Sequence, residues 1–370
     1  MADNKDKKVL NVPALRFPEF TGEWEKCKLS KVCSFFSGGT PPSSNKEYYN
    51  GNIPFIRSGE LHNDETELFI TKEGLDNSAA KMVEVGDLLL ALYGATSGEI
   101  AISKIKGAIN QAILCIRTKQ NKKFVESVWN KHVARLLQTY LQGGQGNLSA
   151  DIVKNIPFYF TNIEEQNKLA RFISLLDQRI AAQNKIIEKL ETLIKGIIET
   201  TISSQKPNTL IKDCLECNSS ILQESQVAEY GAFPVYGATG ITGYTEAADV
   251  NGESILIIKD GSGVGTVKFV AGEYCYIGTL NSLTAKDGYC LKYIYFALQR
   301  FSFEPYKTGM AIPHIYFKDY GKAKIFCPNL KLQFEIAKEL SNINDKIEVE
   351  KQILLCLQKQ KLYLLSQLFL

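Results

Sequence analysis

The chain has 370 residues, with a hydrophobic fraction of 45% and a charged fraction of 22%, which are typical of a globular protein with two or three domains. Its net charge of +3 is close to neutral, so composition alone does not indicate a nucleic-acid-binding protein. No apolar run approaches the roughly 18–20 residues that cross a bilayer, and the polar first residues lead us to expect no signal peptide. Nine scattered cysteines then predict reduced thiols and a cytoplasmic location.

The first region, residues 1–160, is predicted to be a mixed α/β domain with many short strands. The apolar run DLLLALY (87–93) is short and ends at a glycine, as expected for a buried strand. The stretch KFVESVWNKHVARLLQTYL (123–141) predicts a helix in the same domain.

A long amphipathic helix is predicted next, over residues 161–203. Apolar residues step alternately by four and three along it, which is the heptad pattern of a coiled coil. One polar residue, Gln183, interrupts the pattern. The predicted seam consists of Leu169, Ile173, Leu176, Ile180, Gln183, Ile187, Leu190 and Ile194.

Residues 204–328 predict a second mixed α/β domain, which the polar stretch SSQKPN (203–208) separates from the first helix. SILIIK (254–259) predicts a buried strand, and KYIYFALQRF (292–301) predicts a helix. The glycine-rich GSGVGT (261–266) is predicted to be a turn, because it lacks the spacing of a dinucleotide-binding loop and runs into a strand-like segment.

A second long helix is predicted over residues 329–370, again with heptad spacing. A polar residue, Glu350, occupies the position equivalent to Gln183. We therefore expect the two helices to pack on each other, although each could instead pack only on its own domain. The predicted seam consists of Ile336, Leu340, Ile343, Ile347, Glu350, Leu354 and Leu357.

Residues 162–180 and 329–347 are nearly the same sequence, without a gap. Two unrelated amphipathic helices would share apolar positions, but not the same polar residues at the same offsets. The offset also aligns glycines farther upstream, so the chain is predicted to contain two copies of one unit. The matching residues are Asn162 and Asn329, Gln166 and Gln333, Ala170 and Ala337, Ser174 and Ser341, Ile180 and Ile347, Gly94 and Gly261, and Gly98 and Gly265.

Motifs for catalysis are missing from the sequence. There is no phosphate-binding G-x-x-x-x-G-K-[ST] loop, and the three histidines stand in unrelated contexts. Cys214 and Cys217 form a single C-x-x-C pair, whereas a structural zinc site needs four ligands. We therefore predict a binding protein with no catalytic residues and no metal site.

The stretches GGTPPSSNKEYYNGNIPFIRSGEL (38–61) and YGAFPVYGATGITGY (230–244), together with the two similar helix starts, resemble the specificity subunit of type I restriction–modification systems. The resemblance covers essentially the whole chain. The second copy departs from the pattern, with NLKLQ in place of NIEEQ and SSIL in place of GGTP.

This resemblance implies a subunit that recognises double-stranded DNA, with each of two target recognition domains reading one half of a bipartite, asymmetric site. It also implies that the helices set the spacing of the half-sites and hold two methyltransferase (modification) subunits, with restriction subunits joining the full complex. Methyl transfer and DNA cleavage would belong to those partners. S-adenosylmethionine, ATP and Mg²⁺ are accordingly expected on the partner subunits, with no cofactor bound by this chain.

The expected fold is α+β, with two similar mixed α/β domains joined by two long helices in an antiparallel coiled coil with pseudo-twofold symmetry. One alternative is a coiled-coil adaptor with two protein-binding heads, and another is an enzyme whose heads bind a small substrate. The expected segments are residues 1–160 and 204–328 for the two target recognition domains, and 161–203 and 329–370 for the two spacer helices.

Candidate DNA contacts are basic residues in or beside glycine-rich turns, where a loop could enter a groove. Tyr93 is added for its ability to stack or to contact a methyl group. Because phosphate contacts dominate affinity for nucleic acids, the near-neutral chain alone is expected to bind DNA weakly. The candidates are Arg57, Tyr93, Lys104 and Lys106 in the first domain, and Lys259, Lys268 and Lys307 in the second.

Overall fold

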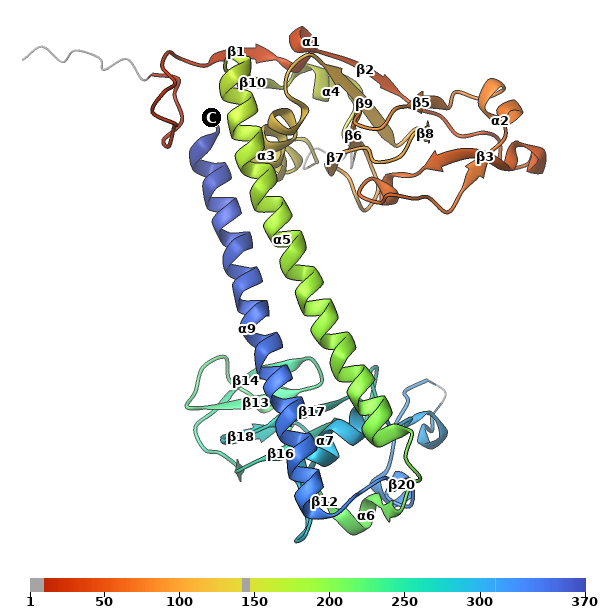
Figure 1. Cartoon of the computed structure of the whole chain (residues 1–370), viewed down its shortest axis with the longest axis vertical. Coiled ribbons are helices and arrows are strands. Elements are labelled where there is room, and N and C mark those ends of the chain that lie inside the picture. Colours follow the sequence, from red (N-terminus) through yellow and green to blue (C-terminus); the bar gives the residue numbers. More distant parts are fainter. Residues whose placement is uncertain (1–9, 142–146, 310) are drawn as a thin grey trace, which may run out of the picture. The chain divides into compact units, whose positions relative to one another are not determined.

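The computed structural model describes residues 10–141, 147–309 and 311–370 (Figure 1). The first nine residues of the predicted first domain lie outside the described residues. The chain forms two compact units, here called unit 1 (residues 1–182 and 354–370) and unit 2 (residues 183–353). Both unit boundaries fall inside the long helices, whereas the sequence predicted boundaries where the helices begin and end.

The described residues of unit 1 form three small sheets, with strand orders β2-β9-β6-β7, β4-β3-β8-β5 and β1-β10. All strand pairs are antiparallel except β3 with β8. The strands are β1 (Glu25–Lys28), β2 (Cys33–Ser37), β3 (Tyr49–Ile56), β4 (Phe69–Ile70), β5 (Lys81–Val83), β6 (Leu88–Ala91), β7 (Ile100–Ile102), β8 (Gly107–Ile109), β9 (Ile113–Thr118) and β10 (Pro157–Phe160).

Unit 2 repeats this arrangement, with strand orders β12-β19-β16-β17, β14-β13-β18-β15 and β11-β20. The parallel pair also recurs, as β13 with β18. The strands are β11 (Thr209–Leu210), β12 (Leu215–Ser219), β13 (Phe233–Gly237), β14 (Gly240–Thr245), β15 (Val250–Asn251), β16 (Ser254–Ile258), β17 (Val267–Val270), β18 (Glu273–Tyr276), β19 (Leu280–Ala285) and β20 (Lys324–Ile325). The predicted internal repeat is therefore confirmed at the level of sheet topology.

The helices of the first copy are α1 (Leu29–Val32), η1 (Lys46–Tyr48), η2 (Ser58–Glu60), α2 (Lys72–Asp76), α3 (Lys122–Leu141), α4 (Ala150–Asn155) and α5 (Ile163–Ile198), followed by a π-helical turn, η3 (Glu199–Ser203). Those of the second copy are α6 (Ile211–Cys214), η4 (Glu224–Gln226), α7 (Leu291–Gln299), η5 (Glu304–Tyr306), α8 (Phe317–Tyr320) and α9 (Leu330–Leu368). Helices α6, η4, α7, α8 and α9 of the second copy follow the order of α1, η1, α3, α4 and α5 in the first, whereas η2, α2 and η5 each occur in one copy alone among the described residues. Helices α3, α5, α7 and α9 confirm the four helices predicted from sequence.

Strand β6 shows how the core of unit 1 is layered. All four of its residues are buried, and successive residues point to opposite faces of the sheet. Leu88 and Leu90 join a large cluster with residues of α3 and α5, whereas Leu89 and Ala91 join a second cluster with residues of β3, β5 and β8. The sheet β2-β9-β6-β7 is thus covered on both sides, which explains the continuous apolar run at 88–92.

The last residues of α9 and the residue that follows them complete the core of unit 1. Leu365, Leu368 and Phe369 are buried in the same cluster as Trp24 and Phe124. In unit 2 the corresponding positions after the middle of α5 are Ile198 and Ile202, which are also buried. The core of unit 1 thus includes the end of α9, which begins in unit 2, and the core of unit 2 includes the end of α5, which begins in unit 1. For this reason the boundaries between the units fall within the two long helices.

Asparagine caps the start of each long helix. The Oδ1 of Asn162 accepts a hydrogen bond from the backbone N–H of Glu165 at 2.9 Å, and Asn329 accepts one from Leu332 at 3.0 Å. These bonds satisfy a backbone donor that has no partner within the helix. The repeated asparagine is therefore structural.

The repeated glutamine is buried and ties the start of each long helix to the start of an earlier helix, α3 in the first copy and α7 in the second. The side-chain amide donates to the carbonyl five residues earlier, at 2.7 Å for Gln166 and 2.8 Å for Gln333. The side-chain oxygen accepts from a backbone N–H at the start of α3 or α7: Asn121 at 3.1 Å for Gln166, and Cys290 at 2.9 Å for Gln333. The polar residues that revealed the repeat thus hold the same local structure twice.

Within each unit, a segment of α5 and a segment of α9 run in opposite directions beside each other (Figure 1). Every predicted seam residue is buried or half-buried, as expected for the faces where the helices meet. Those in unit 1 are Leu169, Ile173, Leu176, Ile180, Leu354 and Leu357; those in unit 2 are Gln183, Ile187, Leu190, Ile194, Ile336, Leu340, Ile343, Ile347 and Glu350.

The two polar seam residues meet in unit 2. Gln183 is 8% exposed and Glu350 is 7% exposed. The Nε2 of Gln183 donates to the Glu350 carbonyl oxygen at 3.0 Å and to the Glu350 carboxylate. Lys346 approaches the same carboxylate at 2.6 Å. A buried polar pair at one heptad position favours one register of two helices, because a slip would break the hydrogen bonds between Gln183 and Glu350 and leave the buried Gln183 amide without this partner.

The carboxylate of Glu350 makes the stability of unit 2 depend on pH. Hydrogen bonds from Lys346 and Gln183 lower its pKa below the usual glutamate value. Its contribution is therefore present above the unfolded pKa of about 4.3, and is lost as the pH falls through the lower folded pKa. We expect Glu350→Gln to remove this part of the acid sensitivity, measured as urea midpoints between pH 3 and 7.

Glu348→Gln is the matched control for this experiment. Glu348 lies on the same helix with its side chain 61% exposed, and its partner Lys351 is 3.5 Å away. An exposed pair of this kind contributes little, so the control should keep the wild-type pH profile. A Glu350→Gln profile parallel to the wild type would contradict the prediction.

Candidate nucleic-acid interface

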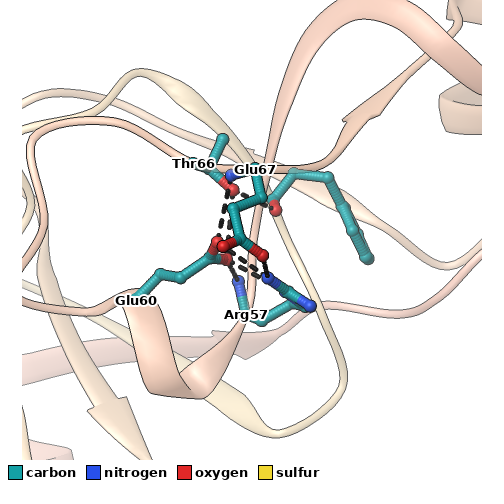
Figure 2. A network of polar contacts seen from close by, with 5 residues as sticks. Arg57, Glu60, Thr66 and Glu67 are labelled. Atoms are coloured by element: carbon teal, nitrogen blue, oxygen red, sulfur yellow. Dashed lines mark hydrogen bonds and ion pairs between the residues drawn. The ribbon is translucent and has the colours of Figure 1, made fainter. Parts of the chain in front are cut away.

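Arg57 lies at the start of the connection between β3 and β4, where a buried carboxylate holds its guanidinium group (Figure 2). Its Nε and Nη2 donate to the two carboxylate oxygens of Glu60 at 3.2 and 3.0 Å. Nη2 also donates to Glu67 at 2.8 Å. The Arg57 side chain is 41% exposed, against 9% for Glu60, so the charged head reaches solvent while its partner does not.

Glu60 is bonded to its own loop as well as to Arg57. The backbone N–H groups of Arg57 and Glu67 donate to its carboxylate at 3.0 and 3.1 Å, and the Thr66 hydroxyl donates at 3.0 Å. Burial would raise the pKa of Glu60, but the hydrogen bonds from Arg57, Glu67 and Thr66 outweigh it and lower the pKa to about 2. The same contacts raise the pKa of Arg57, so both groups are charged at neutral pH.

Lys104 joins the same loop cluster. Its Nζ donates to the backbone carbonyl of His62 at 2.9 Å, and the His62 ring lies 3.4 Å from the carboxylate of Glu99. The structure therefore brings Arg57 and Lys104 to one loop, although they are far apart in sequence. Lys106 instead pairs with Glu84 at 3.0 Å, as an exposed ion pair.

Tyr93 is half-buried and packs against the large core cluster of unit 1. This position, directly after β6, favours a packing role over base stacking.

The candidates in unit 2 do not form one cluster. Lys268 is exposed on β17, with its Nζ 4.8 Å from the centre of the Tyr236 ring. Lys259 follows β16 and is half-buried, and its backbone bonds to Thr279. Lys307 forms an ion pair with Glu304.

A hollow in unit 2 brings together basic residues that sequence reasoning missed. Lys195 and Arg300 line it together with Lys307, beside the glycine turn at 264–267. Lys195 comes from α5, and Arg300 directly follows α7. No local motif could connect them, because their proximity depends on the packing of α5 in unit 2. The Arg57–Glu60 spacing was visible in the sequence, but the pairing with Glu67 was not.

The glycine-rich stretch in unit 2 is a turn, as predicted. Gly261 and Gly265 have φ angles of +95° and +91°, and the equivalent Gly94 and Gly98 have +89° and +87°. In each copy the second glycine N–H donates to a carbonyl at the end of the preceding strand, Ala91 or Ile258, at 2.9 Å. The turn is a backbone element of the repeat and not a phosphate-binding loop.

Within the described ranges, no group of three or more His, Cys, Asp and Glu residues could hold a metal ion. Over the same ranges, no helix has the length and apolar character needed to span a membrane.

Comparison with known proteins places the chain in a family. It matches the type I restriction modification DNA specificity domain over residues 21–192 and again over residues 211–359. These two matches cover most of the chain, one for each copy of the repeat. The chain belongs to the family of type I restriction–modification specificity proteins.

Three relatives illustrate this membership. The MjaVIII specificity subunit of Methanocaldococcus jannaschii is 24% identical over 200 residues, covering 53% of this chain and 45% of that protein. The MjaIX specificity subunit of the same organism is 27% identical over 182 residues, covering 45% and 42%. The EcoprrI specificity subunit of Escherichia coli is 20% identical over 353 residues, covering 87% and 88%. The matches to the two archaeal proteins thus span less than half of their length.

Solved structures show the same fold. The S subunit of a type I restriction–modification system from M. genitalium superposes with a TM-score of 0.67 at 17% identity, covering 97% of this chain and 99% of that chain. A chain from a study of complex assembly and conformational transition of the type I R–M system has a TM-score of 0.56 at 15% identity, covering 94% and 97%. The predicted α+β architecture with an internal repeat is confirmed.

Proposed function

We propose that this chain is the DNA-recognition subunit of a type I restriction–modification complex, in which each unit reads one half of a bipartite, asymmetric site. The observation that carries this proposal is that the two units share one sheet topology but differ in the loops that connect the strands. In unit 1 residues 57–68 connect β3 to β4, whereas in unit 2 only residues 238–239 connect β13 to β14. Two units that share a framework but differ in their loops are suited to recognise two different DNA sequences.

The partners in this proposal are two modification subunits that dock on the long helices, with restriction subunits completing the complex. Exposed apolar residues recur at equivalent helix positions: Ile163 and Leu330 are 44% and 40% exposed, and Ile186 and Ile353 are 43% and 37% exposed. Two equivalent apolar positions would let two copies of one partner bind one chain. We also propose that the length of the helices sets the spacing of the half-sites.

This chain would be non-catalytic and would act in the cytoplasm. The methyl donor S-adenosylmethionine, ATP and Mg²⁺ would be bound by the partner subunits. The purified chain, given all three, should leave DNA unchanged, and without its partners it should bind DNA weakly.

Mapping of methylated bases tests the proposal. The chain, co-expressed with the modification subunit of its own source, should direct methylation to a split motif with two unrelated halves. Omission of the chain is the control and should abolish methylation. A continuous motif would contradict the two-unit assignment. Stable binding of the heads to proteins, with no DNA-dependent methylation, would favour the coiled-coil adaptor.

A further inference from the structure

The loop of residues 57–67 is a feature of unit 1 that has no counterpart among the described residues of unit 2. It follows β3, and its tip is joined to Lys104 through His62. The equivalent β13–β14 hairpin closes directly from Gly237 to Gly240. Because this loop is present in unit 1 and absent from the described part of unit 2, it is a place where two otherwise similar DNA-recognition units can differ in sequence specificity.

Arg57 offers unused donors at the surface of this loop. A guanidinium group carries five N–H donors, and three of those of Arg57 are engaged by Glu60 and Glu67. Nη1 makes no hydrogen bond with the described residues of the chain. Glu67 is 85% exposed, so it can leave Nη2 at little cost when a better acceptor arrives.

Glu60 fixes the orientation of this group before any ligand binds. Its side-on contact with Nε and Nη2 leaves the opposite end of the guanidinium facing outward. Because the arginine is already ordered, less side-chain entropy is lost on binding. Once Glu67 has left, Nη1 and the second N–H of Nη2 form the planar fork that matches two acceptors in one plane.

The charge of the loop disfavours a phosphate as the ligand of Arg57. Besides Glu60, the loop carries Asp64, Glu65 and Glu67, all three exposed, and Arg57 is its only arginine or lysine. Phosphate oxygens would be repelled by these carboxylates. A neutral surface with two coplanar acceptors is compatible with them, and the O6 and N7 atoms of guanine in the major groove form such a surface.

We propose that Arg57 reads a guanine in the half-site of unit 1, and that Glu60 is the residue that positions it. This inference rests on the proposed function and deepens it, since it assigns one base to one side chain. In the free protein, Glu67 accepts a hydrogen bond from Nη2 of Arg57, and this hydrogen bond breaks when DNA binds.

Arg57→Gln in the complex with modification subunits is the direct test. Glu60 keeps three donors in this variant, namely the two backbone N–H groups and the Thr66 hydroxyl, so the loop should stay folded. Methylation rates on duplexes that differ at single base pairs should lose discrimination for guanine at one position of one half-site, by about 10- to 100-fold. The other half-site should not change.

Arg117→Gln is the matched control. Arg117 pairs with Asp87 at 2.8 Å, with side-chain exposures of 46% and 8%. The corresponding values for Arg57 and Glu60 are 41% and 9%. The two arginines therefore have the same chemistry and burial, but Arg117 lies on β9, outside the loop. The Arg117→Gln complex should keep the wild-type motif.

Two further variants separate base recognition from folding. Arg57→Lys keeps the positive charge but loses the fork, so it should relax the same position as Arg57→Gln. Glu60→Gln should weaken the preference for guanine at that position by a smaller factor, which a purely structural role would not do. An unchanged motif for Arg57→Gln and Arg57→Lys would overturn the inference. Failure of the wild-type complex to methylate a split motif would instead overturn the proposed function.

Discussion

Phe369→Ala is expected to destabilise unit 1 by about 3–5 kcal/mol, the usual cost of removing a fully buried aromatic side chain. Phe369 is 1% exposed. Its ring lies 5.5 Å from that of Phe124 and 6.5 Å from that of Trp24, centre to centre. The variant would leave a cavity beside Phe124 at the start of α3 and Trp24 in the segment before β1.

Hydrogen exchange of the full chain gives the measurement for this prediction. Amide protection should fall in β6 and α3 of unit 1, and should stay unchanged in β16 of unit 2. Leu362→Ala is the control, because this residue lies on the last turns of α9, close to Phe369 in sequence, and is 68% exposed. Ile202→Ala, at the equivalent position of unit 2 and 3% exposed, should give the opposite pattern. Equal loss of protection in both units for either core variant would contradict the assignment of these residues to separate cores.

The repeat made most of the fold predictable from sequence. Asn162 and Gln166 recur as Asn329 and Gln333 because capping and backbone bonding at a helix start require those side chains in that order. Heptad spacing predicted which residues of α5 and α9 would be buried, since burial on a helix follows a period of about 3.6 residues.

The division into units was not predictable in the same way. An amphipathic pattern shows which face of a helix is buried, but not which element covers it. Leu365 and Phe369 continue the apolar pattern of α9, and nothing local indicates that they pack beside Trp24. Their place depends on contacts between opposite ends of the chain.

The candidate interface was predictable only in part, for a similar reason. Arg57 was identified from its place beside a glycine-rich segment. Its significance comes from Glu60 and Glu67, whose carboxylates meet it only because the loop folds back on itself. Conversely, Tyr93 has the chemistry of a base-stacking residue, but its position after a buried strand places it against the core.

The paired glycines of the two turns give the second prediction with a large expected effect. Gly265→Ala should destabilise unit 2 by about 2–5 kcal/mol, as the sum of backbone strain and overpacking. Its φ of +91° is unfavourable for alanine, and an added Cβ would lie 2.9 Å from the Cβ of Phe303. Phe303 is 5% exposed and its Cβ is close to the backbone, so it cannot move aside cheaply.

Gly261→Ala separates the two causes. Gly261 has a similar φ of +95°, but an added Cβ would meet nothing within 4 Å. Only the backbone strain of about 1–3 kcal/mol should then appear.

In unit 1, Gly94 at +89° is the equivalent open position. At Gly98 the new Cβ would lie 2.9–3.0 Å from the side-chain ends of Val133 and Leu137, which can rotate away.

We therefore expect the loss of stability to be largest for Gly265→Ala and second largest for Gly98→Ala. The losses for Gly261→Ala and Gly94→Ala should be smallest and about equal. Urea unfolding followed by hydrogen exchange in each unit measures these losses. Equal losses of stability for Gly265→Ala and Gly261→Ala would show that the turn accommodates an alanine Cβ at position 265. Close contact with Phe303 would then not explain why glycine occupies that position.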